Sequence, residues 1–73
     1  MNEFRLLDVV ALTEDLPEYH LRRGQVGTIV EIFQNGKAFE VEFSDRQGQT
    51  YQSIGIEPSK LMVLQYEPEA IAA

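Results

Sequence analysis

Three acidic residues in the middle of the chain have the types and spacing that could do chemistry. Glu31, Glu40 and Glu42 fall on two neighbouring strands of a predicted hairpin, with Glu31 directly opposite Glu40. A paired-carboxylate hydrolase needs a cleft that shields one acid from water, and a flat sheet face offers none. As a functional site, the group would be a docking patch for a basic partner or a weak divalent-cation site. The sequence favours the simpler interpretation, that the group is the solvated face of the sheet.

A second group combines aromatic and basic side chains within one irregular segment. Tyr19, His20, Arg22 and Arg23 lie almost consecutively there. Tyrosine and arginine are enriched among the residues that anchor protein interfaces, so this group predicts a partner-binding surface. The alternative is structural: Tyr19 would cover one end of the fold, and the arginines would pair with nearby acids.

Catalytic and metal-binding residues are not predicted anywhere in the chain. His20 is the single histidine, and a general base also needs a nucleophile within reach. Zinc sites usually take three or four nitrogen or sulfur ligands, and the sequence has no cysteine. We therefore expect a protein without enzymatic activity, bound metal or cofactor.

Composition narrows the class of partner. The 73 residues suffice for one small domain, and six basic residues face twelve acidic ones, for a net charge of −6. Nucleic acid is bound chiefly through Lys and Arg, so a nucleic-acid role is not expected. No apolar run approaches the roughly 18 residues that span a bilayer, and the N-terminus does not resemble a signal peptide. We expect a cytoplasmic protein that does not bind membranes.

Residues 24–43 are predicted to form a β-hairpin. Asn35 and Gly36 tolerate the positive φ that a two-residue type I′ turn needs at both central positions. The resulting register begins with Gln34 opposite Lys37 and ends with Thr28 opposite Phe43. One face then collects four inward apolar residues: Val30, Ile32, Phe39 and Val41. The other face carries the three glutamates and sets Ile29 opposite Glu42.

The remaining segments predict three further strands. The first covers 9–12, with a short helix from Phe4 as the competing interpretation, and a long loop over 13–23 follows it. A turn over 44–49 leads to a strand over 50–56. Pro58 then favours a single 3-10 turn before a last strand over 61–64, which should pair back toward the first. We expect one domain over 1–65 and a frayed tail over 66–73.

Five short strands in this order predict an all-β fold, an SH3-like small five-stranded barrel with one short 3-10 turn before the last strand. The long first loop and the 3-10 turn are its most telling features.

Several stretches also resemble a known group of sequences. They are Leu7-Asp8-Val9-Val10-Ala11-Leu12, Leu16-Pro17-Glu18-Tyr19, Leu21-Arg22-Arg23-Gly24, Val26-Gly27-Thr28-Ile29-Val30-Glu31 and Glu40-Val41-Glu42-Phe43. Through them the chain resembles an uncharacterised family of small bacterial domains of unknown function. This resemblance supports the SH3-like fold and does not supply an activity. A looser likeness, carried by the loop and the Gly27-Thr28-Ile29 stretch, links it to the SH3-like domain of nitrile hydratase β subunits. The metal ligands of that enzyme belong to its other subunit, so no catalysis is implied.

These observations predict a non-enzymatic protein-binding module, an accessory or adaptor domain for another bacterial protein. The partner would be a protein held by the long loop and also by the acidic strands, and weak homo-oligomerisation is left open. The alternative function is an antitoxin or immunity protein whose acidic surface neutralises a basic toxin.

Overall fold

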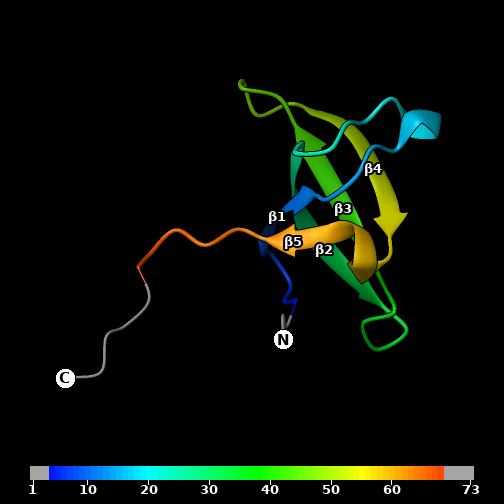
Figure 1. Ribbon diagram of the computed structural model, residues 1–73, viewed down its shortest axis with the longest axis vertical. Coiled ribbons are helices and arrows are strands. Elements are labelled where there is room, and N and C mark those ends of the chain that lie inside the picture. Colours follow the sequence, from blue (N-terminus) through cyan, green and yellow to red (C-terminus); the bar gives the residue numbers. More distant parts are fainter. Residues whose placement is uncertain (1–3, 69–73) are drawn as a thin grey trace.

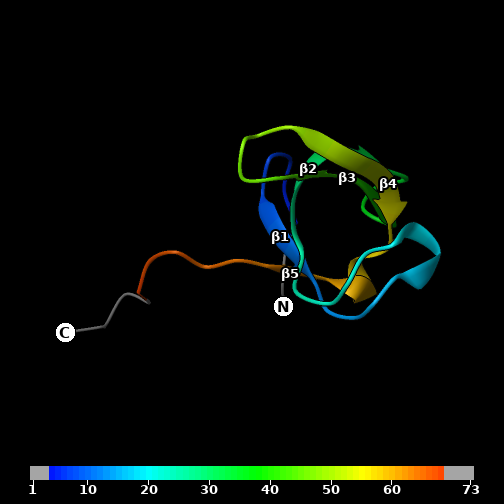
Figure 2. The ribbon, with the colours of Figure 1, turned by 90° about the horizontal axis from the view of Figure 1, so that it is seen from above.

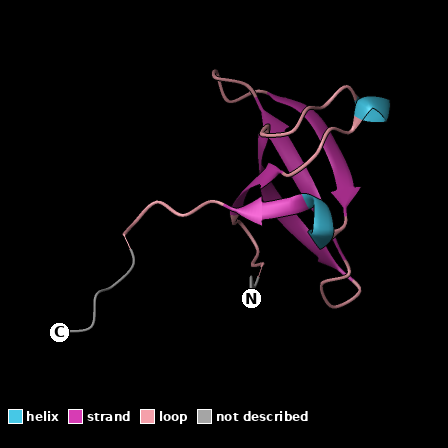
Figure 3. Ribbon diagram, viewed as in Figure 1, coloured by secondary structure: helices cyan, strands magenta, loops and turns pink. Residues whose placement is uncertain are grey.

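The computed structural model describes residues 4–68 and shows an all-β chain. Its strands are β1 (Val9–Leu12), β2 (Val26–Phe33), β3 (Ala38–Ser44), β4 (Thr50–Ile56) and β5 (Leu61–Val63). Two short 3-10 helices, η1 (Pro17–Tyr19) and η2 (Pro58–Lys60), interrupt the loops (Figure 3). The strand prediction for 9–12 is confirmed over the competing helix, and η2 is confirmed as the 3-10 turn before the last strand. η1 was not predicted, although it begins at Pro17 as η2 begins at Pro58.

The strands form one antiparallel sheet in the order β4-β3-β2-β1-β5 (Figure 1). All five strands contribute side chains to a single core cluster, so their inner faces look onto the same interior. A flat sheet could not do this, and the view from above shows the strands curling around that interior (Figure 2). The last strand pairs with β1 as predicted. This architecture is consistent with the predicted SH3-like barrel.

The core is apolar throughout the described residues. Its largest fully buried side chains are Phe43, Leu12, Ile29, Val10 and Val41. Phe4 packs onto Phe39, with ring centroids 5.0 Å apart. No helix among residues 4–68 is long and apolar enough to cross a membrane.

The chain reverses between β2 and β3 as predicted, but the predicted turn is displaced. Gln34 and Asn35 take positive φ values of 49° and 59°, and the Gly36 N–H donates to the Phe33 carbonyl at 3.0 Å. Lys37 donates to the same carbonyl at 3.1 Å, so four residues rather than two connect the strands. The two-residue turn at Asn35-Gly36 is therefore wrong by one position, although Asn35 and a left-handed Gly36 both belong to the loop.

The hairpin register is as predicted only near this loop. Three pairs agree with the prediction: Phe33 with Ala38, Ile32 with Phe39 and Glu31 with Glu40. A bulge at Val30, between Ile29 and Glu31, then shifts every later pair by one residue. The next pairs are Ile29 with Val41, Thr28 with Glu42 and Gly27 with Phe43.

Three predicted side-chain positions are wrong, and the bulge accounts for two of them, Ile29 and Val30. Ile29, expected on the outer face, is completely buried, whereas Val30 and Ile32, expected inside, are 37% and 40% exposed. An extra residue exchanges the two faces of a strand, because side chains alternate with a period of two. Ile32 still pairs with the buried Phe39, but it lies at the end of the hairpin where less of the chain covers it.

Gly27 supplies a physical reason for the shifted register. A Cβ at this position would stand 2.6 Å from Val41 Cγ1, 2.9 Å from the Glu42 carbonyl and 3.0 Å from Phe43 Cδ1. Only a residue without a side chain lets β2 approach β3 so closely here. β5 ends at Val63, one residue before the predicted 64. The tail predicted over 66–73 lies largely outside the described residues.

Candidate functional site

The long loop between β1 and β2 folds into a small lobe, residues 16–21. Leu16 and Leu21 exchange two backbone hydrogen bonds, of 2.9 and 3.1 Å, and both side chains are buried. Between them η1 begins at Pro17 and ends where His20 takes a left-handed φ of 60°. The two leucines therefore anchor the lobe to the core, and its tip presents Tyr19 and His20 to solvent on the β4 side (Figures 1 and 2).

Hydrogen bonds fix the base of the lobe. The Arg23 N–H donates to Asp15 Oδ1 at 2.8 Å, and the Gly24 N–H donates to the Leu12 carbonyl at 2.8 Å. Gln25 Nε2 donates to the Tyr51 hydroxyl at 2.9 Å, which ties the end of the loop to β4. The loop is thus held at both ends.

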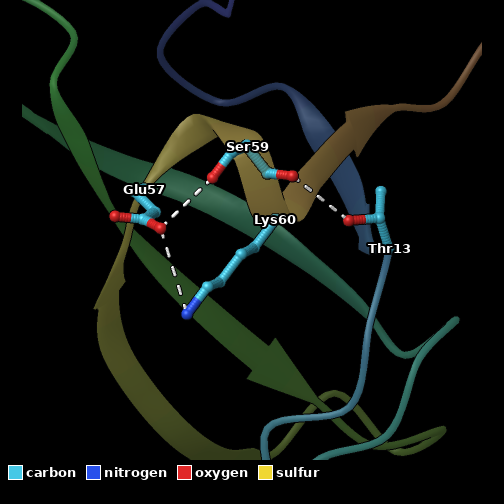
Figure 4. A network of polar contacts seen from close by, with 4 residues as sticks. All are labelled: Thr13, Glu57, Ser59 and Lys60. Atoms are coloured by element: carbon cyan, nitrogen blue, oxygen red, sulfur yellow. Dashed lines mark hydrogen bonds and ion pairs between the residues drawn. The ribbon is translucent and has the colours of Figure 1, made fainter.

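The start of the loop is also tied to η2 (Figure 4). The Thr13 hydroxyl donates to the Ser59 carbonyl at 3.4 Å, and the Thr13 N–H donates to the Lys60 carbonyl at 2.9 Å. Glu57, the residue before this short helix, accepts through Oε1 from the Ser59 hydroxyl at 3.2 Å, and the same oxygen lies 4.0 Å from Lys60 Nζ. The two hydrogen bonds from Thr13 therefore fix the start of the loop relative to η2.

A shallow hollow of about 150 Å³ lies between the lobe and this helix. Its lining residues are Leu16, Glu18, Tyr19, Gly55, Ile56, Glu57 and Lys60. Leu16 and Ile56 are both 4% exposed and so contribute little accessible surface, and most of the accessible lining is polar, with charged side chains of both signs. His20 is not among the lining residues. The residues that line this hollow include no serine, cysteine or histidine.

The aromatic and basic group predicted from the sequence is divided between two surfaces. Tyr19 lines the hollow beside η2, whereas Arg23 lines a separate depression of about 370 Å³ with Met62 on β5. His20 and Arg22 are exposed and line neither. Within residues 4–68 neither arginine side chain forms an ion pair. The predicted pairing of arginines with nearby acids is thus not seen there.

The three predicted glutamates do share one outer face of the sheet. Glu31 lies opposite Glu40 as predicted, but Glu42 lies opposite Thr28 rather than Ile29, as a result of the bulge. The Ser53 hydroxyl of β4 donates to Glu40 Oε2 at 2.7 Å. In the part of the chain that the structure describes, no three or more His, Cys, Asp and Glu side chains are placed to hold a metal ion.

Sequence reasoning missed the second wall of the hollow. Gly55, Ile56, Glu57 and Lys60 come from the junction of β4 and η2, far from the lobe in the chain. The available signal was the predicted pairing of the last strand with the first, which brings the turn before β5 close to the loop after β1. Nothing in the local residue pattern points from one wall to the other.

Comparison with known families finds one family model that matches most of the chain. Residues 6–63 match a family described as a domain of unknown function, DUF4926. The chain belongs to this family. The DUF4926 match covers every strand, the lobe and η2, so both walls of the hollow lie within the domain. No curated protein and no solved structure is significantly similar to the chain.

Proposed function

We propose that this DUF4926 domain is a non-enzymatic protein-binding module, an accessory or adaptor domain for another bacterial protein in the cytoplasm. The binding surface is the hollow between the lobe and η2, with Tyr19 as its central contact. The partner is a protein, since a net charge of −6 opposes nucleic acid.

One observation carries this proposal: Tyr19 is 40% exposed on a loop that is otherwise anchored at both ends. Tyrosine is enriched among the residues that contribute most to binding at protein interfaces. Because the loop is already ordered, binding costs little additional conformational entropy. The mixed charges of Glu57 and Lys60 at the rim then favour a partner segment with polar groups of both kinds.

The test is purification of the partner complex from the native host with a tagged domain. Tyr19→Ala should reduce the amount of a defined partner at least tenfold, since interface anchors commonly contribute about 2 kcal/mol or more. Tyr66→Ala is the matched control, because Tyr66 is 74% exposed in the segment after β5. The reverse result, a complex that survives Tyr19→Ala and is lost with Tyr66→Ala, refutes this location.

The shared face of Glu31, Glu40 and Glu42 favours a second candidate, an antitoxin or immunity protein that covers a basic toxin site. Co-expression of the wild-type domain with the product of the neighbouring gene should then restore growth. Triple replacement of the glutamates by glutamine should abolish the rescue. Growth that stays inhibited with the wild-type domain eliminates this candidate.

A further inference from the structure

The two edges of the sheet differ in how far they are protected from pairing with another chain. β5 is only three residues long, and short edge strands are a common protection. β4 is seven residues long and reads Thr-Tyr-Gln-Ser-Ile-Gly-Ile, without a charged residue or a proline. Apart from a register shift near its start and the lobe beside Gly55 and Ile56 at its end, β4 therefore lacks the usual features that discourage strand addition.

Backbone groups on this edge point away from the sheet. The Ser53 N–H donates to the side chain of its own neighbour, Gln52, at 3.3 Å. It therefore faces outward rather than toward β3. Alternate residues of an antiparallel strand share this orientation, so Gly55 presents its backbone in the same direction. A weak, local bond of this kind is easily exchanged for a bond to an incoming strand.

Small residues leave the acidic face open along the same edge. On the outer face, Ser53 lies opposite Glu42 and Gly55 lies opposite Glu40. Glu40 Oε1 is 3.9 Å from where a Cβ on Gly55 would stand, so its carboxylate extends over the glycine toward the edge. Neighbouring strands are about 4.8 Å apart, which puts this carboxylate within reach of a long side chain on an added strand.

We propose that β4 accepts an extended segment of a partner protein as an added antiparallel strand, whose alternate Lys or Arg side chains cross Ser53 and Gly55 to reach Glu42 and Glu40. This inference rests on the proposed function, because it names the chemistry of the protein partner. Main-chain hydrogen bonds supply affinity in such strand addition, and side chains at alternate positions supply specificity. Gly55 also lines the hollow beside Tyr19, so the segment would continue directly into it.

Charge complementarity favours this occupant over a second copy of the chain. A copy pairing through its own β4 would bring no cation, because that strand contains none. The acidic residues on β3 would then stay without basic partners in the complex. A basic segment instead places opposite charges side by side, which steers association and sets register.

The probe is a capped heptapeptide of alternating valine and lysine, titrated into the full chain and followed by calorimetry and by amide shifts of β4. The wild-type protein should bind it with the largest shifts at Ser53 and Gly55. Gly55→Lys should weaken binding at least about tenfold, because a cation of the chain then occupies the place over Glu40. Gly55→Gln is the matched control, since it fills similar space without charge and should weaken binding much less.

Two further experiments distinguish strand addition from simple charge attraction. Methylating the backbone nitrogens on one edge of the peptide keeps its charges and removes its main-chain donors, so binding should be lost. A protein with Glu40→Lys and Glu42→Lys should instead bind the corresponding valine and glutamate peptide. Equal binding of the methylated peptide, no binding of the original peptide, or dimerisation of the free chain through β4 would overturn the proposal.

Failure of the strand-addition proposal can be distinguished from failure of the proposed function. A native complex that is lost with Tyr19→Ala but unchanged by Gly55→Lys retains the binding module and rejects the added strand. A native complex that is indifferent to Tyr19→Ala rejects the hollow itself, whatever the peptide does.

Discussion

The lobe and the central hairpin are two regions of the molecule that are ordered in different ways. The hairpin contributes Ile29, Phe39, Val41 and Phe43 to the core, and each is at most 2% exposed. The lobe buries only the two leucines at its base and holds its tip by backbone hydrogen bonds. Folding stability therefore resides mainly in the hairpin, and the surface of the lobe tip is left available for recognition.

A charge in the hairpin core should have the largest effect. Val41 is completely buried, and Val41→Lys would leave an unpaired charge there at a cost of several kcal/mol. Because a small domain has only about 5–15 kcal/mol of stability, we expect the variant to be unfolded by circular dichroism and amide dispersion. Glu42→Lys, one residue along on the outer face, should stay folded. A native spectrum for Val41→Lys would contradict the assignment of the inner face.

Removing an anchor of the lobe should have a smaller and more local effect. Leu21 is 2% exposed, and Leu21→Ala should cost about 2–5 kcal/mol of lobe stability through lost burial and a cavity. Hydrogen exchange should accelerate in the lobe while β3 stays protected, because the lobe can open separately. Glu18→Ala at the exposed tip is the control and should leave exchange unchanged. Equal acceleration in lobe and hairpin would show that the two regions unfold together.

The close contact of β2 with β3 should be sensitive to a single methyl group. Gly27→Ala sets a Cβ against Val41, Phe43 and a backbone carbonyl, and overpacking of this kind costs about 1–3 kcal/mol. Chemical denaturation should show the loss as a lower midpoint. Gly55→Ala is the control, because its Cβ would meet only Glu40 at 3.9 Å. A Gly27→Ala protein as stable as Gly55→Ala would remove the steric reason for the observed register.

The smallest effect is expected at the bulge. Val30 is 37% exposed, so Val30→Thr should change stability by no more than about 0.5 kcal/mol. Ile29→Ala, one residue earlier, should cost about 2–5 kcal/mol because its side chain is fully buried. Thermal melts of the two variants would compare them directly. A larger loss of stability for Val30→Thr than for Ile29→Ala would contradict the bulge and favour the register predicted from the sequence.

Much of the fold could be predicted from local sequence patterns. The two strands of the hairpin show where such a prediction succeeds and where it fails. β3 alternates buried and open positions along most of its length, as its sequence indicated. β2 has the same apolar composition, yet its burial pattern breaks after Ile29. The prediction placed Val30 inside and Ile29 outside because an alternating pattern gives no sign of an inserted residue.

The candidate site could likewise be predicted only in part. Tyr19 and Arg23 could be singled out because their residue types suit interfaces, and the three glutamates could be assigned to one face by counting along the strands. Their grouping could not be foreseen. Tyr19 faces the β4–η2 junction and Arg23 faces β5, because the backbone turns at the base of the lobe between them.

The sequence by itself determined the five strands, the reversal between β2 and β3 and the inner face of β3, because each follows from turn residues and from side chains a few positions apart. Only the tertiary structure decided the bulge at Val30, the burial of Ile29 and the wall that stands opposite Tyr19. These depend on contacts between segments distant in the chain, above all on the space that Gly27 leaves for β3.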